Sequence, residues 1–381
     1  MTRQNGSIIG EQIKGPNQPG MWTPTDAQQR ALTGEWGTGL ATIRYLCVGG
    51  GGGGGSARPS EINAGGGGGG GVVTGTEILY EGRKYYVAAG NAGSPGSPQY
   101  IPGGRGGLSE FTTTTPQAPP QYPGTSFKNV AYGGGGGRSY NSPPSPGNQQ
   151  HGGSGGGASS NPGPTYRGGG LNAPYIGGDL AQGGIPQPLV NSEFPDYVPG
   201  TTQGYRGGDN AAPPTDRGGG GGGGAGGEGG NASSQSGGAG GVGYQSDITG
   251  SNVYYGGGGG GGGPTGGGSG GSGGGGNGAG PVPPTTAVAG SPGTYYGGGG
   301  GGAATRPGNP SGNKEGGKGY PGVVILRYPN AFELDLSSSP QAPTDVNSNY
   351  QIKIVDEGDV GSDHYVAFGA PVMDLKFKRK Y

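Results

Sequence analysis

Short runs of apolar and β-branched residues alternate with long stretches of glycine, and these runs predict the strands of the chain. Residues 41–48 and 322–328 are rich in valine, isoleucine, leucine and tyrosine, which is typical of β-strands. Two further strands are predicted over residues 72–80 and 84–89, with a hairpin turn at residues 81–83. The first two runs bracket the glycine-rich region as the ends of a closed domain would.

The two ends of the chain have a more ordinary pattern. Thr23, Pro24 and Asp26 form a helix start signal: a capping threonine, a proline at the first helical position and an acid in the first turn. We expect this short helix to end near Leu32, because Gly34 follows. The C-terminal segment contains three further predicted strands, at residues 350–355, 364–368 and 372–377.

These patterns divide the chain into three predicted parts. They are a leader with a short helix over residues 1–40, a glycine-rich domain over residues 41–329 and a C-terminal β module over residues 330–381. Between residues 90 and 321, glycine tracts alternate with polar, proline-rich loops at irregular spacing, so the region is not a strict sequence repeat. The longest uninterrupted tracts are Gly49–Gly55, Gly65–Gly71, Gly218–Gly224, Gly256–Gly263 and Gly297–Gly302.

Composition changes the expected fold class. The chain has 107 glycines and 35 prolines among 381 residues, and only 27 % of its residues are hydrophobic, so a large apolar core is not expected. Without a Cβ, adjacent chains of the polyproline II form can approach closely on all sides and hydrogen-bond to one another. We therefore expect a mostly irregular and β fold: a bundle of glycine-rich polyproline II-type helices (a polyglycine II sandwich) with short flanking β-strands and one N-terminal helix. Flexible, disordered glycine linkers are the alternative.

Charge and hydropathy exclude several classes of partner. The net charge of −1 argues against nucleic acid as the main partner, because binding to phosphates needs a cationic surface. No run reaches the about 18 apolar residues of a membrane helix, so membrane insertion is not expected. The N-terminus also lacks the pattern of a signal peptide.

The residues that usually carry catalysis are scarce. The two histidines, His151 and His364, and the single cysteine, Cys47, form neither a metal-ligand spacing nor a nucleophile motif. The acidic run at residues 356–359 could offer oxygen ligands to calcium, but its spacing does not fit an EF-hand loop, and a solvated turn is favoured. We predict no catalytic, cofactor or metal site and expect that the chain is not an enzyme.

Tyrosine supplies the candidate contact residues. The chain has 22 tyrosines against 6 phenylalanines, and tyrosine among proline, serine, asparagine and glycine is typical of adaptable binding surfaces. Tyrosine also stands directly before several glycine tracts, as at Tyr132, Tyr255 and Tyr296. The alternative, that these rings pack against the edges of the bundle or between subunits, stays open. The candidate receptor or interface residues are Tyr100, Tyr122, Tyr140, Tyr166, Tyr175, Tyr197 and Tyr205.

Several segments resemble a known family. Residues 45–48, which lead into Gly49–Gly55, resemble the opening of the glycine-rich domain of bacteriophage tail-fibre and virion structural proteins, as do residues 65–76. Residues 319–329 resemble the closing strand of that domain. The leader resembles phage structural proteins as well, because its residues 20–22 form a glycine, hydrophobic residue and tryptophan element before the predicted helix.

The resemblance implies a place in the virion, as a tail fibre or capsid-surface protein that contacts the host surface through loops at the distal end of a polyglycine II-type bundle. The implied partners are other virion proteins and a host cell-surface glycan or outer-membrane protein, and the implied assembly is a homo-oligomer, with a trimer as the first expectation. Two alternatives stay open. One is a purely structural virion fibre or capsid-associated protein, and the other is a cellular extracellular glycine-rich filament or matrix protein.

Overall fold

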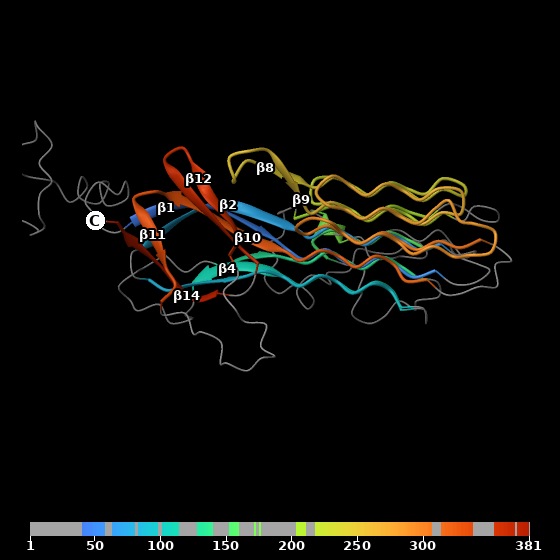
Figure 1. The fold of residues 1–381 in the computed structure, drawn as a ribbon, viewed down its shortest axis with the longest axis horizontal. Helices are drawn as coiled ribbons and strands as arrows, with labels where there is room; N and C mark the ends of the chain where they lie inside the picture. The colour runs from blue at the N-terminus through green and yellow to red at the C-terminus, as the bar shows by residue number, and fades with distance from the viewer. Residues whose placement is uncertain are drawn as a thin grey trace, which may run out of the picture.

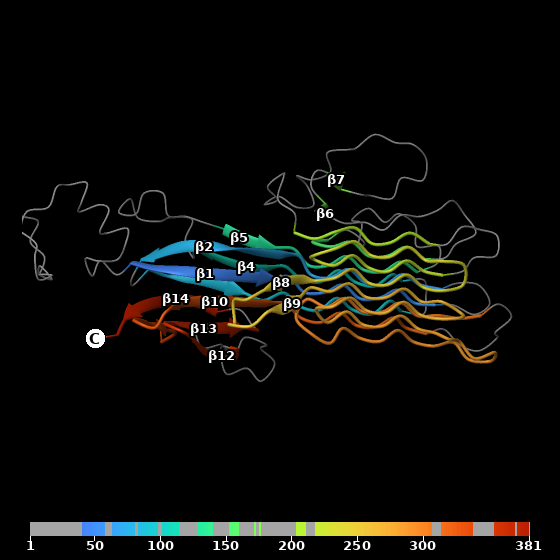
Figure 2. The same ribbon diagram turned by 90° about the horizontal axis from the view of Figure 1, so that it is seen from above.

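The fold comes from a computed structural model. Strands gather at one end of the molecule, and glycine tracts run from them side by side to the other end (Figures 1 and 2). The structure describes residues 40–57, 63–80, 83–97, 101–113, 128–139, 152–159, 171–172, 175–176, 203–210, 218–306, 314–337, 354–369 and 372–380.

Two five-stranded antiparallel sheets form the strand-rich end. The first has the order β12-β13-β10-β1-β2 and the second the order β11-β14-β3-β4-β5, while β6-β7 and β8-β9 are two-stranded hairpins. The strands are β1 Leu40–Val48, β2 Val72–Tyr80, β3 Tyr85–Ala88, β4 Ser109–Thr113, β5 Lys128–Ala131, β6 Leu171–Asn172, β7 Tyr175–Ile176, β8 Tyr244–Ser246, β9 Val253–Tyr255, β10 Val323–Pro329, β11 Phe332–Asp335, β12 Ile354–Val360, β13 Asp363–Phe368 and β14 Val372–Arg379.

The two five-stranded sheets enclose a hydrophobic core that contains residues of both. Ile43, Tyr45 and Cys47 of β1 belong to this core, whereas the intervening Leu46 and Val48 belong to a second cluster. This alternation follows from the two-residue period of a strand. Side chains from the segment 248–255, around the β8-β9 hairpin, join the second cluster and so cover the outer face of the first sheet.

The predicted fold class is wrong. The chain is not a mostly irregular bundle with short flanking strands: it is β-rich, its sheets carry an apolar core, and the residues that the structure describes include no helix. The average composition misled the prediction because apolar residues are concentrated in the strands, where alternation directs them to two hydrophobic clusters. The helix expected between Thr23 and Leu32 lies outside the described residues.

Individual strands were predicted more successfully than the fold class. The strands expected at residues 41–48, 72–80, 84–89 and 322–328 are confirmed as β1, β2, β3 and β10. In the C-terminal segment β13 and β14 are confirmed. The strand expected at residues 350–355 overlaps β12 at residues 354–355, and residues 350–353 lie outside the described residues. There, β13 pairs with β10 and β14 pairs with β3, so this segment completes both sheets. The three-part division of the chain stays a prediction.

The glycine tracts continue the strands in the same register. Val48 of β1 pairs with Val72 of β2, and in the adjoining tracts Gly52 donates to the carbonyl of Gly68 at 2.9 Å. The pairing of β1 with β10 continues in the same way, since Gly54 donates to Gly317 at 2.8 Å. The strand pairings therefore set which residues of neighbouring tracts face each other.

Within a tract, the bonding partner changes with a three-residue period. Gly49, Gly52 and Gly55 donate to one neighbouring tract, whereas the residues between them donate to others. A backbone with three residues per turn directs successive amides to three sides in this way. The other N–H groups of Gly49–Gly55 bond to residues 104–107 and 317–320, and its carbonyls accept from residues 93–96, 134–137 and 300–303.

Glycine-only tracts occupy the interior of this arrangement. A Cβ added to Gly51 would fall on the carbonyl oxygen of Gly298, and one added to Gly67 would fall on that of Gly52. Outer tracts instead carry an exposed side chain at every third residue, as at Ala239 and Val242. We call five tracts the interior tracts: Gly49–Gly55, Gly65–Gly71, Gly218–Gly224, Gly256–Gly263 and Gly297–Gly302.

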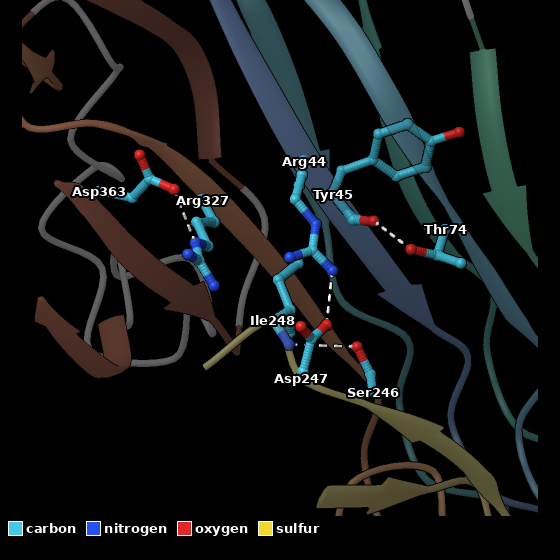
Figure 3. Close-up of polar contacts among 8 residues, drawn as sticks. All are labelled: Arg44, Tyr45, Thr74, Ser246, Asp247, Ile248, Arg327 and Asp363. Carbon is cyan, nitrogen blue, oxygen red and sulfur yellow. Dashed lines mark hydrogen bonds and ion pairs between the residues drawn. The ribbon is translucent and has the colours of Figure 1, made fainter. Parts of the chain in front are cut away.

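One ion pair ties the β8-β9 hairpin to the first sheet. Arg44 Nη2 of β1 lies 2.6 Å from Asp247 Oδ1, directly after β8 (Figure 3). The hydrogen bond from Arg44, and then its charge, lower the pKa of the Asp247 carboxyl. A second pair, Arg327 with Asp363 at 2.9 Å, joins β10 to β13 (Figure 3).

Arg44→Met is expected to raise the pKa of Asp247 towards the ordinary aspartate value, because the principal donor and charge are removed. A lowered carboxyl pKa stabilises the fold above the unfolded-state pKa of about 3.9, and this contribution disappears as the pH falls through the folded-state pKa. Carboxyl NMR titration measures the midpoint directly. Arg327→Met is the matched control, since Arg327 is the smallest of the causes that lower this pKa. An unchanged midpoint in Arg44→Met would show that the pair does not form in solution.

Candidate binding surface

Two of the candidate tyrosines chosen from the sequence, Tyr175 and Tyr205, lie within the described residues. Tyr205 lies half-buried in an outer tract, where its N–H donates to Gly224 and its carbonyl accepts from Gly155. Tyr175 lies in β7. The remaining candidates lie outside the described residues: Tyr100, Tyr122, Tyr140, Tyr166 and Tyr197. Their role in binding stays a prediction.

A different set of tyrosines gathers where the strands meet the glycine tracts. Two Tyr-Tyr pairs, at residues 254–255 and 295–296, each stand directly before an interior tract. The glycine after each pair has a positive φ, 71° at Gly256 and 74° at Gly297, which a residue with a Cβ rarely adopts. Gly256 donates to the carbonyl of Tyr296 at 3.0 Å, so the two motifs are bonded to each other.

Their rings form a continuous row. The ring centroids are 5.7 Å apart for Tyr255 and Tyr295, 4.9 Å for Tyr295 and Tyr296, and 5.8 Å for Tyr296 and Tyr320. These separations and the tilted or edge-on planes are those of favourable aromatic pairs. Tyr255 is buried and anchors the row, whereas Tyr295 keeps 38 % of its surface exposed. The buried Tyr255 therefore holds the row in place, while Tyr295 presents its ring to solvent.

The β12-β13 hairpin holds a carboxylate next to Tyr365, which shares a hydrophobic cluster with Tyr255 and Tyr296. The hydroxyl of Tyr365 in β13 donates to Asp356 Oδ2 of β12 at 3.1 Å, and Asp356 is exposed. Tyr365 and Tyr296 pack against the same hydrophobic cluster as Tyr255. We call these six residues the tyrosine–aspartate surface: Tyr255, Tyr295, Tyr296, Tyr320, Tyr365 and Asp356.

The tyrosine–aspartate surface carries a negative charge. Burial is the first cause that raises the pKa of Tyr255, Tyr295, Tyr296 and Tyr365, and the charge of Asp356 raises each of them further. No cationic side chain contributes to the pKa of any of these four hydroxyls among the described groups. The hydroxyls therefore stay protonated beside a carboxylate, and the surface offers aromatic faces and one negative charge.

The residues considered for metal or catalytic chemistry make ordinary contacts, and one of them, Asp356, belongs to the tyrosine–aspartate surface. His364 Nδ1 lies 2.8 Å from Asp359 Oδ1 at the tip of the β12-β13 hairpin. The acidic run at residues 356–359 belongs to β12. In the described ranges, no group of three or more histidine, cysteine, aspartate and glutamate side chains is placed to hold a metal ion.

Cys47 is enclosed in the core between the sheets, with none of its surface exposed. Burial, and then the charge of Glu110, raise the pKa of its thiol well above the ordinary value. Since the thiolate is the reactive form, we expect native protein to resist iodoacetamide and unfolded protein to react rapidly. Mass spectrometry of samples quenched with and without denaturant measures the modified fraction. Rapid, complete labelling of the native chain would contradict the described core.

The fold and this surface define a β-rich protein whose strands lead into a block of glycine tracts. A family model described as a glycine-rich domain matches residues 27–329. The chain belongs to this glycine-rich domain family. Comparison with curated proteins gives no match, and comparison with solved structures gives none. Within the described residues, no helix has the length and hydropathy needed to cross a bilayer.

The family match and the tyrosine–aspartate surface do not coincide. The matched segment ends at residue 329, so it contains the tyrosine row but not Tyr365 or Asp356. In the sequence, Tyr255 and Tyr296 stand out only as residues at the entrances of tracts. The repeated Tyr-Tyr-Gly motif at residues 254–256 and 295–297 was the signal that could have joined them. Nothing in the sequence marked Asp356 as their neighbour.

Proposed function

We propose that the chain is a non-enzymatic structural component of a bacteriophage virion, a tail fibre or adhesin subunit that contacts the host surface. The observation that carries this proposal is the hydrogen bonding of the interior tracts on all sides, in register with the sheets. Such a block is stiff, needs few side chains and suits a part that holds a contact surface away from its attachment point. The resemblance of residues 45–76 and 319–329 to phage glycine-rich domains supports the virion setting.

The partners in this proposal are other virion proteins at one end and a host glycan or outer-membrane protein at the other. A homo-oligomer, with a trimer as first expectation, belongs to the same proposal. An exposed tyrosine surface favours a contact role over a purely structural one, because tyrosine adds contact area at a low entropic cost. A purely structural virion protein and a cellular glycine-rich filament or matrix protein are the competing functions.

Antibodies raised against the full-length chain test the proposal. The first measurement is immunogold electron microscopy of phage particles released by cells that carry the gene. Labelled tails or capsid surfaces support a virion component, whereas labelled cell envelopes with bare particles support the cellular matrix protein. The second measurement is phage adsorption in the presence of monovalent antibody fragments. Inhibited adsorption supports the adhesin, and unchanged adsorption of labelled particles supports the purely structural alternative.

A further inference from the structure

We propose that the tyrosine–aspartate surface binds an organic cation of the quaternary ammonium class, such as the trimethylammonium group of choline. This inference goes beyond the proposed function, because it rests on the described contacts alone. It would apply equally to a virion protein and to a cellular matrix protein.

The aromatic row supplies the first half of the recognition. A cation within about 6 Å of a tyrosine centroid is attracted by the negative face of the ring, and quaternary ammonium groups are typically held by several such rings. Tyr295 and Tyr296 lie 4.9 Å apart and Tyr296 and Tyr320 5.8 Å apart, so one cation can contact more than one ring. The exposed Tyr295 leaves the row open to solvent.

Asp356 supplies the second half. Its described polar side-chain contact is the hydroxyl of Tyr365, and no cationic side chain of the described chain pairs with it. Three other aspartates differ in this respect: Asp247 and Asp363 each pair with an arginine, and Asp335 pairs with Lys378. A carboxylate beside aromatic faces and without a counter-ion favours a cationic ligand over a neutral one.

The type of cation follows from the same two features. An ammonium or guanidinium group needs hydrogen-bond acceptors for its N–H groups, and a strongly hydrated cation loses more on leaving water. A trimethylammonium group has no N–H donor and is bound through its methyl groups and its charge. The tyrosine–aspartate surface offers extended aromatic area and one carboxylate, which matches these needs.

Purified full-length chain and choline chloride provide the direct test. Saturation-transfer NMR and isothermal titration calorimetry measure binding of choline and of its neutral isostere, 3,3-dimethylbutan-1-ol. We expect saturable choline binding that is roughly five- to tenfold tighter than binding of the isostere, as cation–π and carboxylate terms of this size predict. Equal affinities would overturn the proposal, because the surface would then recognise shape and not charge. Absence of saturable choline binding would overturn it as well.

Variants assign the effect to the surface. Asp356→Asn keeps the size of the side chain and is expected to weaken choline binding about fivefold while leaving the isostere unchanged. Tyr295→Phe keeps the ring and is expected to bind choline nearly as well as the native chain, whereas Tyr295→Leu is expected to lose most binding. Matched controls are Asp359→Asn, on the same strand, and Tyr244→Leu, with comparable exposure at 37 %. Thermal midpoints of all variants confirm that they fold.

A last arm distinguishes the source of the choline group. Phosphocholine in solution and vesicles of phosphatidylcholine carry the same cation in different settings. Competition of phosphocholine with choline, without co-sedimentation of the chain with vesicles, indicates a soluble or polymer-linked choline ligand. Co-sedimentation that Asp356→Asn weakens indicates a lipid head group. Binding of both probes that is indifferent to Asp356→Asn and Tyr295→Leu would place the site elsewhere and overturn the proposal.

Discussion

Gly67→Ala is expected to destabilise the folded chain by roughly 3 kcal/mol or more, the upper end of the cost of overpacking a close-packed interior. Gly67 lies in an interior tract, where its N–H donates to Gly300 at 2.7 Å and its carbonyl accepts from Gly259 at 2.8 Å. A Cβ at this position would fall on the carbonyl oxygen of Gly52. Neighbouring backbones cannot move aside as a flexible side chain could, so they must separate. Urea denaturation followed by circular dichroism measures the loss.

Gly266→Ala is the matched control, because it makes the same chemical change in an outer tract. The nearest heavy atom to a Cβ at Gly266 is Ser236 Oγ at 3.9 Å, an ordinary contact. We expect a change of at most about 1 kcal/mol, in the direction of higher stability, because alanine lowers the entropy of the unfolded chain. If Gly67→Ala unfolded at the same urea concentration as Gly266→Ala, the close packing of the interior tracts would be wrong.

The contrast between these two positions shows what the sequence encodes about the tracts. Uninterrupted glycine runs occupy the interior, because every direction around them is occupied by another backbone. Outer tracts carry one side chain per three residues, as at Ser269 and Ser272 or at Glu315 and Lys318, all of which are exposed. This spacing could have been read from the sequence as a sign of an outer tract. The irregular spacing of whole tracts concealed it.

The packing order of the tracts was not predictable, because glycine runs are chemically identical. Gly67 accepts from Gly259 and donates to Gly300, yet nothing local distinguishes these partners from other glycines. The pairing of the tracts is determined instead by the strands next to them in the sequence, because the side chains of those strands select their partner strands. Val48 opposite Val72 sets one pair of tracts, and Val48 opposite Val323 sets another. A strand predicted in isolation does not reveal its partner.

The missed strands and the missed surface have a related cause. β4 and β5 are short and contain polar residues such as Glu110 and Lys128, so neither reads as a strand on its own. Both form because neighbouring strands and tracts offer backbone partners. The tyrosine–aspartate surface likewise depends on tertiary pairing, since Asp356 meets Tyr365 across the paired strands β12 and β13. The local sequence pattern identifies the tyrosines but not the residues that surround them in the fold.

Phe111→Ala is expected to destabilise the chain by about 3–5 kcal/mol, the usual cost of removing a buried phenylalanine. Phe111 of β4 is fully buried between the sheets, with its ring 5.8 Å from Tyr45 and 6.2 Å from Tyr85. The exposed Leu108, just before β4, supplies the control: Leu108→Ala removes an apolar side chain outside the core and should change stability by no more than about 0.5 kcal/mol.

The more informative consequence of Phe111→Ala concerns the glycine tracts. The register of β4 with β3 and β5 continues into the tracts, where Gly104 donates to Ser94 and Gly103 donates to Gly137. Glycine has no side chain that could specify one register over another, so the tracts should lose order when the sheets do. Hydrogen exchange of the Gly104 and Val87 amides under increasing denaturant measures both regions. We expect both amides to lose protection at the same denaturant concentration, lower in Phe111→Ala than in the native chain. Protection of Gly104 that outlasts that of Val87 would show instead that the tracts hold their pairing without the sheets.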